Sequence, residues 1–178
     1  MMKATMTAAA LVGLANGVFA AGSDFSAPPK PTKTTTECIR GQVFDEKKGA
    51  CGDPKESSLT DDQLYGAARE LAYAGQYDTA LTVLALAKDQ NDPRILNYKG
   101  FANRKAGRME VGMAYYRAAL DRDPNHILAR SYMGQALVQQ GDMLGAKAQL
   151  AEIRTRGGRN SWAYTALKLA ISGQPSNY

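Results

Sequence analysis

Apolar and small residues recur at helical spacing between residues 61 and 173, and glycines and prolines interrupt the pattern at regular intervals. One glycine follows about fourteen residues after the start of each predicted unit, where a first helix should end. These glycines, spaced 32 and 34 residues apart, are Gly75, Gly107 and Gly141. The pattern predicts three helix–turn–helix units followed by one more helix. Their ranges are 61–92, 93–126, 127–160 and 161–173.

Capping signals mark both ends of this helical region. Thr60 and Gln63 have the spacing of a capping box, which predicts a helix start directly after Thr60. Ser161 can cap the last helix, which should end near Ile171 because glycine and proline follow. Flanking this region we expect a linker over residues 52–60 and a tail over residues 174–178.

Small residues occupy three equivalent positions of the predicted units, with one exception. The eighth, twentieth and twenty-seventh positions hold Ala68, Gly100 and Gly134, then Ala80, Gly112 and Ala146, and then Ala87, Ala119 and Ile153. Small side chains at such positions allow helix axes to approach to ~8–10 Å. The repetition therefore predicts close helix crossings at the same place in every unit.

This spacing and these positions resemble the tetratricopeptide repeat (TPR) family, whose unit has 34 residues in two antiparallel helices. The resemblance implies an all-α fold, a right-handed α-solenoid of three TPR-like helix pairs with a C-terminal capping helix. The first unit departs from the family pattern by ending two residues early, before Pro93. The third has Ile153 at a small position and lacks a closing proline. A helical bundle without a true repeat is the alternative.

The first twenty residues have the layout of a secretory signal peptide. Lys3 provides the positive start, an apolar and small-residue run follows over residues 4–19, and small residues precede a predicted cleavage site after Ala20. A retained membrane anchor is the alternative, but the run has about 16 residues and a spanning helix needs ~20. We therefore expect a mature chain that has no membrane span and is periplasmic or secreted.

A linker and a pair of cysteines precede the helices. Residues 21–37 contain three prolines, a threonine run and little apolar surface, which predicts a disordered linker. Cys38 and Cys51 follow, and in an oxidising compartment we expect a disulfide that closes a hairpin over residues 38–51. A redox-active pair is the alternative, although such pairs favour a tight C-x-x-C motif.

Charge is distributed unevenly along the mature chain. Residues 21–93 carry 8 basic and 12 acidic side chains, whereas residues 94–159 carry 12 basic and 5 acidic side chains. A basic half favours an acidic partner, and a well-solvated surface is the alternative. For an exported protein we expect that partner to be a protein or an envelope polymer rather than nucleic acid.

The TPR resemblance also implies a binding face. In that family the first helices of stacked units line a concave surface, and fixed positions on each first helix face the ligand. In this sequence the residues selected at those positions are Tyr65, Arg69, Tyr73, Asn97, Phe101, Arg104, Lys105 and Gln135. Aromatic anchors interleaved with basic side chains would suit an extended peptide with acidic and apolar side chains. The alternative is a solvated face on which the aromatic rings cover neighbouring helices.

Catalysis has little support in the composition. The chain has one histidine and two cysteines, which are too few ligands for a zinc site. No nucleophile elbow, H-E-x-x-H, phosphate-binding loop or dinucleotide-binding pattern occurs. We expect no catalytic residues, no metal and no cofactor. The expected function is that of a periplasmic TPR adaptor for a protein or peptide, and the alternative is a peptidoglycan- or glycan-binding protein.

Overall fold

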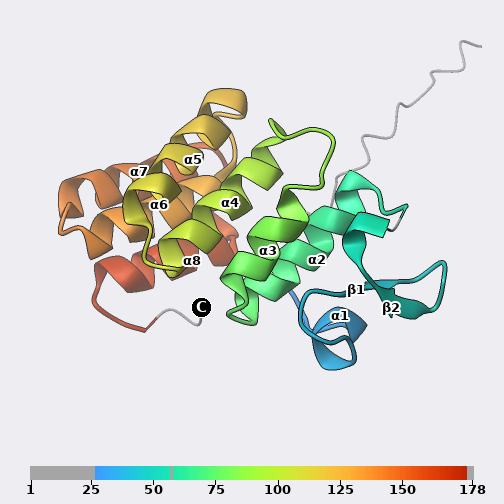
Figure 1. Cartoon of the computed structure of the whole chain (residues 1–178). Helices are drawn as coiled ribbons and strands as arrows, with labels where there is room; N and C mark the ends of the chain where they lie inside the picture. The colour runs from blue at the N-terminus through green and yellow to red at the C-terminus, as the bar shows by residue number, and fades with distance from the viewer. Residues whose placement is uncertain (1–26, 57, 176–178) are drawn as a thin grey trace, which may run out of the picture.

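The computed structural model describes residues 27–56 and 58–175 (Figure 1). The predicted signal peptide 1–20 and residues 21–26 of the predicted linker lie outside the described residues. The elements, in chain order, are α1 (Lys33–Thr36), β1 (Val43–Asp45), β2 (Ala50–Gly52), η1 (Pro54–Glu56), α2 (Asp61–Tyr73), α3 (Tyr77–Leu84), α4 (Pro93–Lys105), α5 (Met109–Arg122), α6 (Ile127–Gln139), α7 (Met143–Thr155), η2 (Gly158–Asn160) and α8 (Trp162–Ile171).

Helices α2, α4 and α6 are each followed by a glycine in the left-handed conformation. The φ angle is +77° at Gly75, +84° at Gly107 and +82° at Gly141, a region that glycine enters without steric cost. The N–H after each glycine donates to a carbonyl five residues earlier, at 2.8–2.9 Å. The same local chemistry thus ends a helix three times and turns α3, α5 and α7 back onto α2, α4 and α6.

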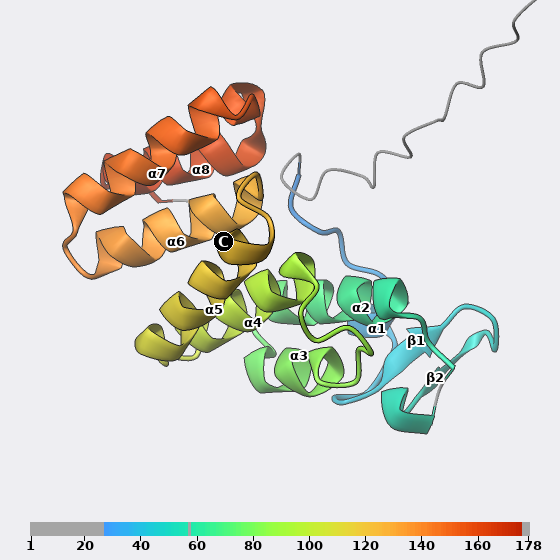
Figure 2. The ribbon, with the colours of Figure 1, turned by 90° about the horizontal axis from the view of Figure 1, so that it is seen from above.

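The helices lie in two layers (Figure 2). In one layer α2 contacts α4, α4 contacts α6 and α6 contacts α8. Each of α3, α5 and α7 packs against its own partner helix and against the next helix of that layer. The fold is therefore all-α, with one small two-stranded hairpin at the end of the stack beside α2. Within the described ranges, no helix is both long enough and apolar enough to cross a membrane.

Small residues lie where the helices cross most closely. A Cβ on Gly100 would lie 2.7 Å from the Tyr116 ring and 3.1 Å from the backbone oxygen of Gly112, which fixes the crossing of α4 and α5. A Cβ on Gly134 would lie 2.6 Å from Leu167 of α8, so the last helix closes tightly over α6. Two of the predicted close approaches thus occur at glycines where a Cβ would lie less than 3 Å from a neighbouring side chain.

The predicted disulfide hairpin is confirmed. Cys38 and Cys51 are bonded, with their Cα atoms 5.5 Å apart. Strands β1 and β2 pair in antiparallel fashion, with Phe44 opposite Cys51. Val43 of β1 is 3% exposed and belongs to the same hydrophobic cluster as Leu64 of α2. The hairpin therefore packs on the first helix pair.

The prediction of a disordered linker is wrong for its C-terminal part. We call residues 27–37 the strap, and within it α1 packs against α2. The carboxylate of Glu70, 6% exposed, accepts hydrogen bonds from the backbone N–H and the hydroxyl of both Thr32 and Thr35. One buried carboxylate on α2 therefore orders threonines that composition alone assigns to a tether.

Candidate functional site

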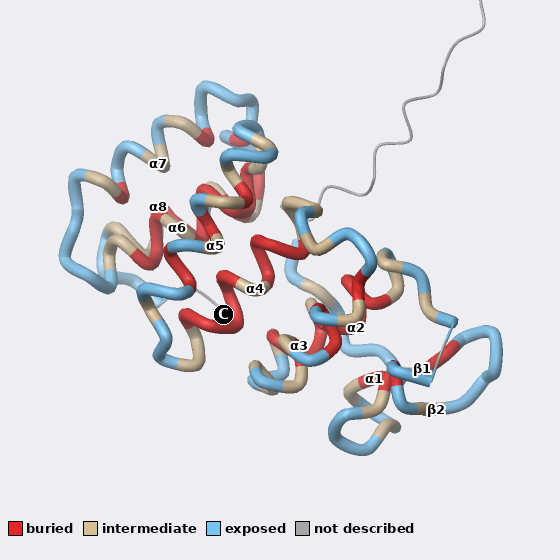
Figure 3. The backbone as a smooth tube through the Cα atoms, turned by 45° about the horizontal axis from the view of Figure 1, so that its top comes forward, coloured by how far each residue is buried: buried red, intermediate tan, exposed pale blue. Residues whose placement is uncertain are grey.

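The eight predicted binding residues lie on three neighbouring helices, and together they define what we call the inner face. Tyr65, Arg69 and Tyr73 are on α2, Gln135 is on α6, and the other four are on α4. Helix α4 is buried along most of its length (Figure 3). Five of the eight are buried, with exposed fractions of 0–6%: Tyr65, Asn97, Phe101, Arg104 and Gln135.

Phe101 is a core residue, contrary to the expectation of an exposed aromatic anchor. Its ring is 1% exposed, stacks on Tyr73 with centroids 5.4 Å apart, and lies 4.7 Å from the ring of Tyr132. The position of Phe101 within its predicted helix does not reveal that rings from both flanking helices cover its side chain. The alternative arrangement, in which aromatic rings cover neighbouring helices, describes this part of the inner face better.

Two tyrosines that the site prediction omitted complete this aromatic cluster. Tyr98 and Tyr132 hold the sixth position of the second and third units. This repetition in the sequence could have identified them as residues of the inner face. The Tyr132 hydroxyl lies 2.7 Å from the hydroxyl of Tyr73, and Arg69 Nε donates to the Tyr98 hydroxyl at 3.0 Å. Burial, with the neighbouring tyrosines, raises the pKa of Tyr132 well above its usual value. The Tyr132 hydroxyl therefore stays protonated at physiological pH.

Asn97 lies in the middle of α4 with its side-chain amide unsatisfied. The residue is 0% exposed, and neither Oδ1 nor Nδ2 has a hydrogen-bond partner in the described structure. Phe101 and Arg104 follow it by one and two helical turns, so these residues share one stripe of α4. Since buried amides in folded proteins are nearly always hydrogen-bonded, this group needs a physical explanation.

Arg104 and Lys105 end α4 with two adjacent positive charges. Arg104 Nε donates to the Tyr116 hydroxyl at 3.2 Å, and Nη1 donates to Gln139 Oε1 at 3.1 Å. Nη2 is buried and has no hydrogen-bond partner in the part of the chain that the structure describes. Burial, together with the charge of Arg104, lowers the pKa of Lys105. This end of the inner face is therefore electropositive.

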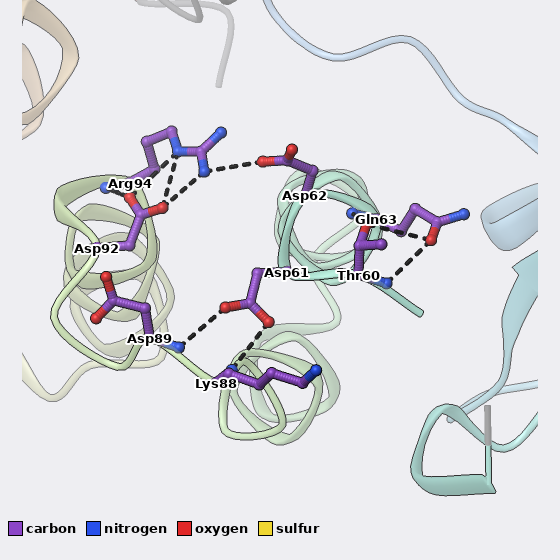
Figure 4. A network of polar contacts seen from close by, with 8 residues as sticks. All are labelled: Thr60, Asp61, Asp62, Gln63, Lys88, Asp89, Asp92 and Arg94. Atoms are coloured by element: carbon purple, nitrogen blue, oxygen red, sulfur yellow. Dashed lines mark hydrogen bonds and ion pairs between the residues drawn. The ribbon is translucent and has the colours of Figure 1, made fainter. Parts of the chain in front are cut away.

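Carboxylates join α2 to α4 at the opposite end of these helices (Figure 4). Arg94 forms ion pairs with Asp92 at 2.6 Å and with Asp62 at 2.9 Å. The carboxylate of Asp61 accepts hydrogen bonds from the backbone N–H groups of residues 88–89, which hold its pKa below the usual range. Arg94 is thus paired with two carboxylates within the protein, unlike the arginine at the other end of α4.

A hollow of about 600 Å³ lies where the strap, the hairpin and α2 meet. Lys30 and Lys33 of the strap, Phe44 and Glu46 of the hairpin, and Gln63 of α2 are among the residues that line it. The Lys33 ammonium lies 4.7 Å from the centre of the Phe44 ring, so that ring is already engaged by a cation. The hollow is a second candidate site with mixed charge.

Comparison with models of known protein families finds no match, and comparisons with curated proteins and with solved structures find none either. The residues described here also include no group of three or more histidine, cysteine or acidic side chains placed to hold a metal ion.

Proposed function

We propose that the protein is an exported TPR-like adaptor that binds a protein or peptide partner on the inner face. The proposal combines the expected signal peptide with a stack of helix pairs whose turns and close crossings follow the repeat positions. The disulfide is compatible with export, because such bonds persist in oxidising compartments.

The amide of Asn97 is the observation that carries the proposal. A primary amide offers one acceptor and two donors, which can pair with the N–H and C=O of an extended peptide. Leaving such a group buried and unpaired costs about 1–3 kcal/mol. Asn97 is fully buried, so a partner backbone reaches its amide only if the side chains over it move on binding, and pairing with the amide would then remove that cost.

The charge of the inner face indicates what kind of peptide fits. Arg69, Arg104 and Lys105 lie on its α2 and α4 portions, and the chain has an excess of basic groups from residue 94 to residue 159. Acidic side chains on the partner would complement this charge. The buried aromatic cluster then acts as a rigid floor that positions the polar groups, rather than as a set of exposed anchors.

An envelope-polymer binder is the second candidate, and the hollow between strap and α2 is the observation that favours it. Its volume of about 600 Å³ is in the range of small-ligand sites. Lys30 and Lys33 could contact the carboxylates of an anionic glycan. The engagement of Phe44 by Lys33 leaves no open aromatic platform there, so the adaptor is our first choice.

Site-directed photo-crosslinking in the envelope tests the adaptor function. A photoreactive amino acid replaces Val138, a half-buried residue near the end of α6, and the matched control carries it at Lys147 on the exposed side of α7. We expect one protein to be captured through position 138, to be absent at position 147, and to disappear when Asn97→Leu is added. Equal capture at both positions, or capture that Asn97→Leu does not change, would contradict the proposal.

A further inference from the structure

Arg104 is a buried cation without an anionic partner in the described structure. Its side chain is 5% exposed, and its hydrogen bonds go to two neutral oxygens, those of Tyr116 and Gln139. The second buried arginine of the described residues, Arg130, is 9% exposed and also donates its hydrogen bonds to neutral oxygens, but it has a carboxylate oxygen of Glu152 3.8 Å away. The contrast shows that this helical stack pairs a buried guanidinium with a carboxylate in one place and does not do so at Arg104.

An unpaired buried charge is costly, because the protein interior replaces water poorly as a solvent for ions. The adjacent Lys105 adds a second positive charge, and its lowered pKa has burial and the Arg104 charge as its causes. A carboxylate placed between these two groups would offset both penalties at once. The electrostatics of this corner therefore favour an anion that the described residues do not supply.

The geometry of Arg104 is suited to a carboxylate. The Tyr116 hydroxyl holds Nε, and the guanidinium carbon lies 5.7 Å from the centre of the Phe101 ring, so the plane of the group is fixed from two sides. Nη2 has no hydrogen-bond partner in the described ranges, and Nη1 is held only by the neutral amide oxygen of Gln139. A carboxylate that displaces this amide could accept from both terminal nitrogens in the two-pronged arrangement that arginine forms with carboxylates.

Gln139 is positioned to be displaced. It is the last residue of α6, and it is solvent-exposed although the guanidinium beneath it is buried. An exposed glutamine loses little when its amide returns to water, because its contact with Arg104 is a single hydrogen bond. The side chain therefore covers the site in the free protein without closing it.

We propose that Arg104 and Lys105 form a carboxylate-binding subsite at the end of the inner face, which Gln139 covers until a ligand arrives. The ligand is an acidic peptide, through an Asp or Glu side chain or through a chain-terminal carboxylate. The inference rests on the proposed function and names the chemistry that the partner must present. Arg104 supplies the forked hydrogen bonds, and Lys105 supplies a second charge.

The variant Gln139→Glu tests the subsite without any ligand. It places a carboxylate next to Arg104 Nη1, so the ion pair forms within the protein. The control Gln174→Glu makes the same change at an exposed position after α8. We expect the Tm of Gln139→Glu to exceed that of the control by roughly 2–6 °C, and the difference to shrink in high salt. A Tm at or below that of the control would overturn the proposal.

A nuclear magnetic resonance titration of the full mature protein tests binding directly, with the Arg104 Nε–H signal as the readout. Acetylated tetraglutamate amide presents side-chain carboxylates only, acetylated tetra-alanine presents a terminal carboxylate only, and acetylated tetraglutamine amide is the neutral control. We expect at least one acidic probe to shift the signal, and Gln139→Glu to weaken that binding tenfold or more. The responding probe identifies which kind of carboxylate is bound.

No shift with either acidic probe, or an equal shift with the neutral peptide, would overturn the subsite. This failure is distinguishable from failure of the adaptor function. If photo-crosslinking through position 138 still depends on Asn97 while Gln139→Glu captures the partner normally, the inner face binds a partner that makes no carboxylate contact with Arg104.

Discussion

Replacing Asn97 with leucine should make the protein more stable and less able to bind its partner. Leucine has the same number of side-chain heavy atoms as asparagine, although its methyl groups are bulkier, and it removes two buried polar atoms that lack hydrogen-bond partners in the described chain. A buried unsatisfied amide costs about 1–3 kcal/mol, so we expect a gain of about 2 kcal/mol in the free energy of unfolding. For a chain of 178 residues this corresponds to a rise in Tm of roughly 4–8 °C.

Asn103 provides a matched control on the same helix. It is 6% exposed, its Nδ2 donates to the Lys99 carbonyl at 2.8 Å, and its Oδ1 accepts from Arg108 Nε at 2.7 Å. Asn103→Leu breaks both hydrogen bonds and should lower the free energy of unfolding by about 1–3 kcal/mol. The same substitution at two positions six residues apart should therefore have effects of opposite sign.

Chemical denaturation of the two variants and the parent chain measures both effects. If Asn97→Leu is destabilised as strongly as Asn103→Leu, the Asn97 amide has a partner within the folded protein and the argument for a bound peptide fails. If Asn97→Leu is more stable but captures the partner as before, the amide is unpaired for a reason unrelated to binding.

The packing and the disulfide each yield a prediction. Gly100→Ala brings a Cβ to 2.7 Å from the Tyr116 ring and should lower the free energy of unfolding by about 1–3 kcal/mol. A Cβ on Gly66 would have nothing within 4 Å, so Gly66→Ala should raise the free energy of unfolding by about 0.5–1 kcal/mol in the same denaturation assay. Replacing Cys38 and Cys51 by serine should cost roughly 3 kcal/mol of hairpin stability and leave the far-ultraviolet circular dichroism of the helices intact. Loss of that helical signal would contradict the second prediction, and equal effects of the two glycine variants would contradict the first.

Features that depend on local chemistry could be predicted from the sequence. Gly75 marks a helix end because the chain needs a residue in the left-handed conformation to leave α2. Thr60 forms its capping box with a residue only three positions away. Gly100 marks a helix crossing because a small residue occupies the same position in all three predicted units. The pairing of Cys38 with Cys51 was predicted from their spacing and from the export that the expected signal peptide implies. Each of these inferences uses neighbours in the chain or in the repeat.

Features that depend on distant contacts could not be predicted in this way. The strap is ordered by Glu70, which lies 38 residues after Thr32, and nothing near Thr32 indicates that a carboxylate will reach it. Phe101 looked like a ligand-facing anchor because its helical position is correct, but Tyr73 and Tyr132 come from two other helices to cover it. The unpaired state of Asn97 is likewise visible only when every neighbour is placed.

The disulfide loop lies inside the longer loop that closes when the strap docks on α2, and this arrangement determines how strongly oxidation influences docking. The contact between Thr32 and Glu70 closes a loop of 38 residues, and the Cys38–Cys51 bond, with a sequence separation of 13, lies inside it. The bond shortens the path through that loop to about two-thirds, which lowers the entropy cost of closing it by only about 0.3 kcal/mol. Oxidation therefore changes the docking equilibrium of the strap by less than a factor of two. The strap should dock on α2 as the chain folds, whether the two thiols have already been oxidised or are still reduced.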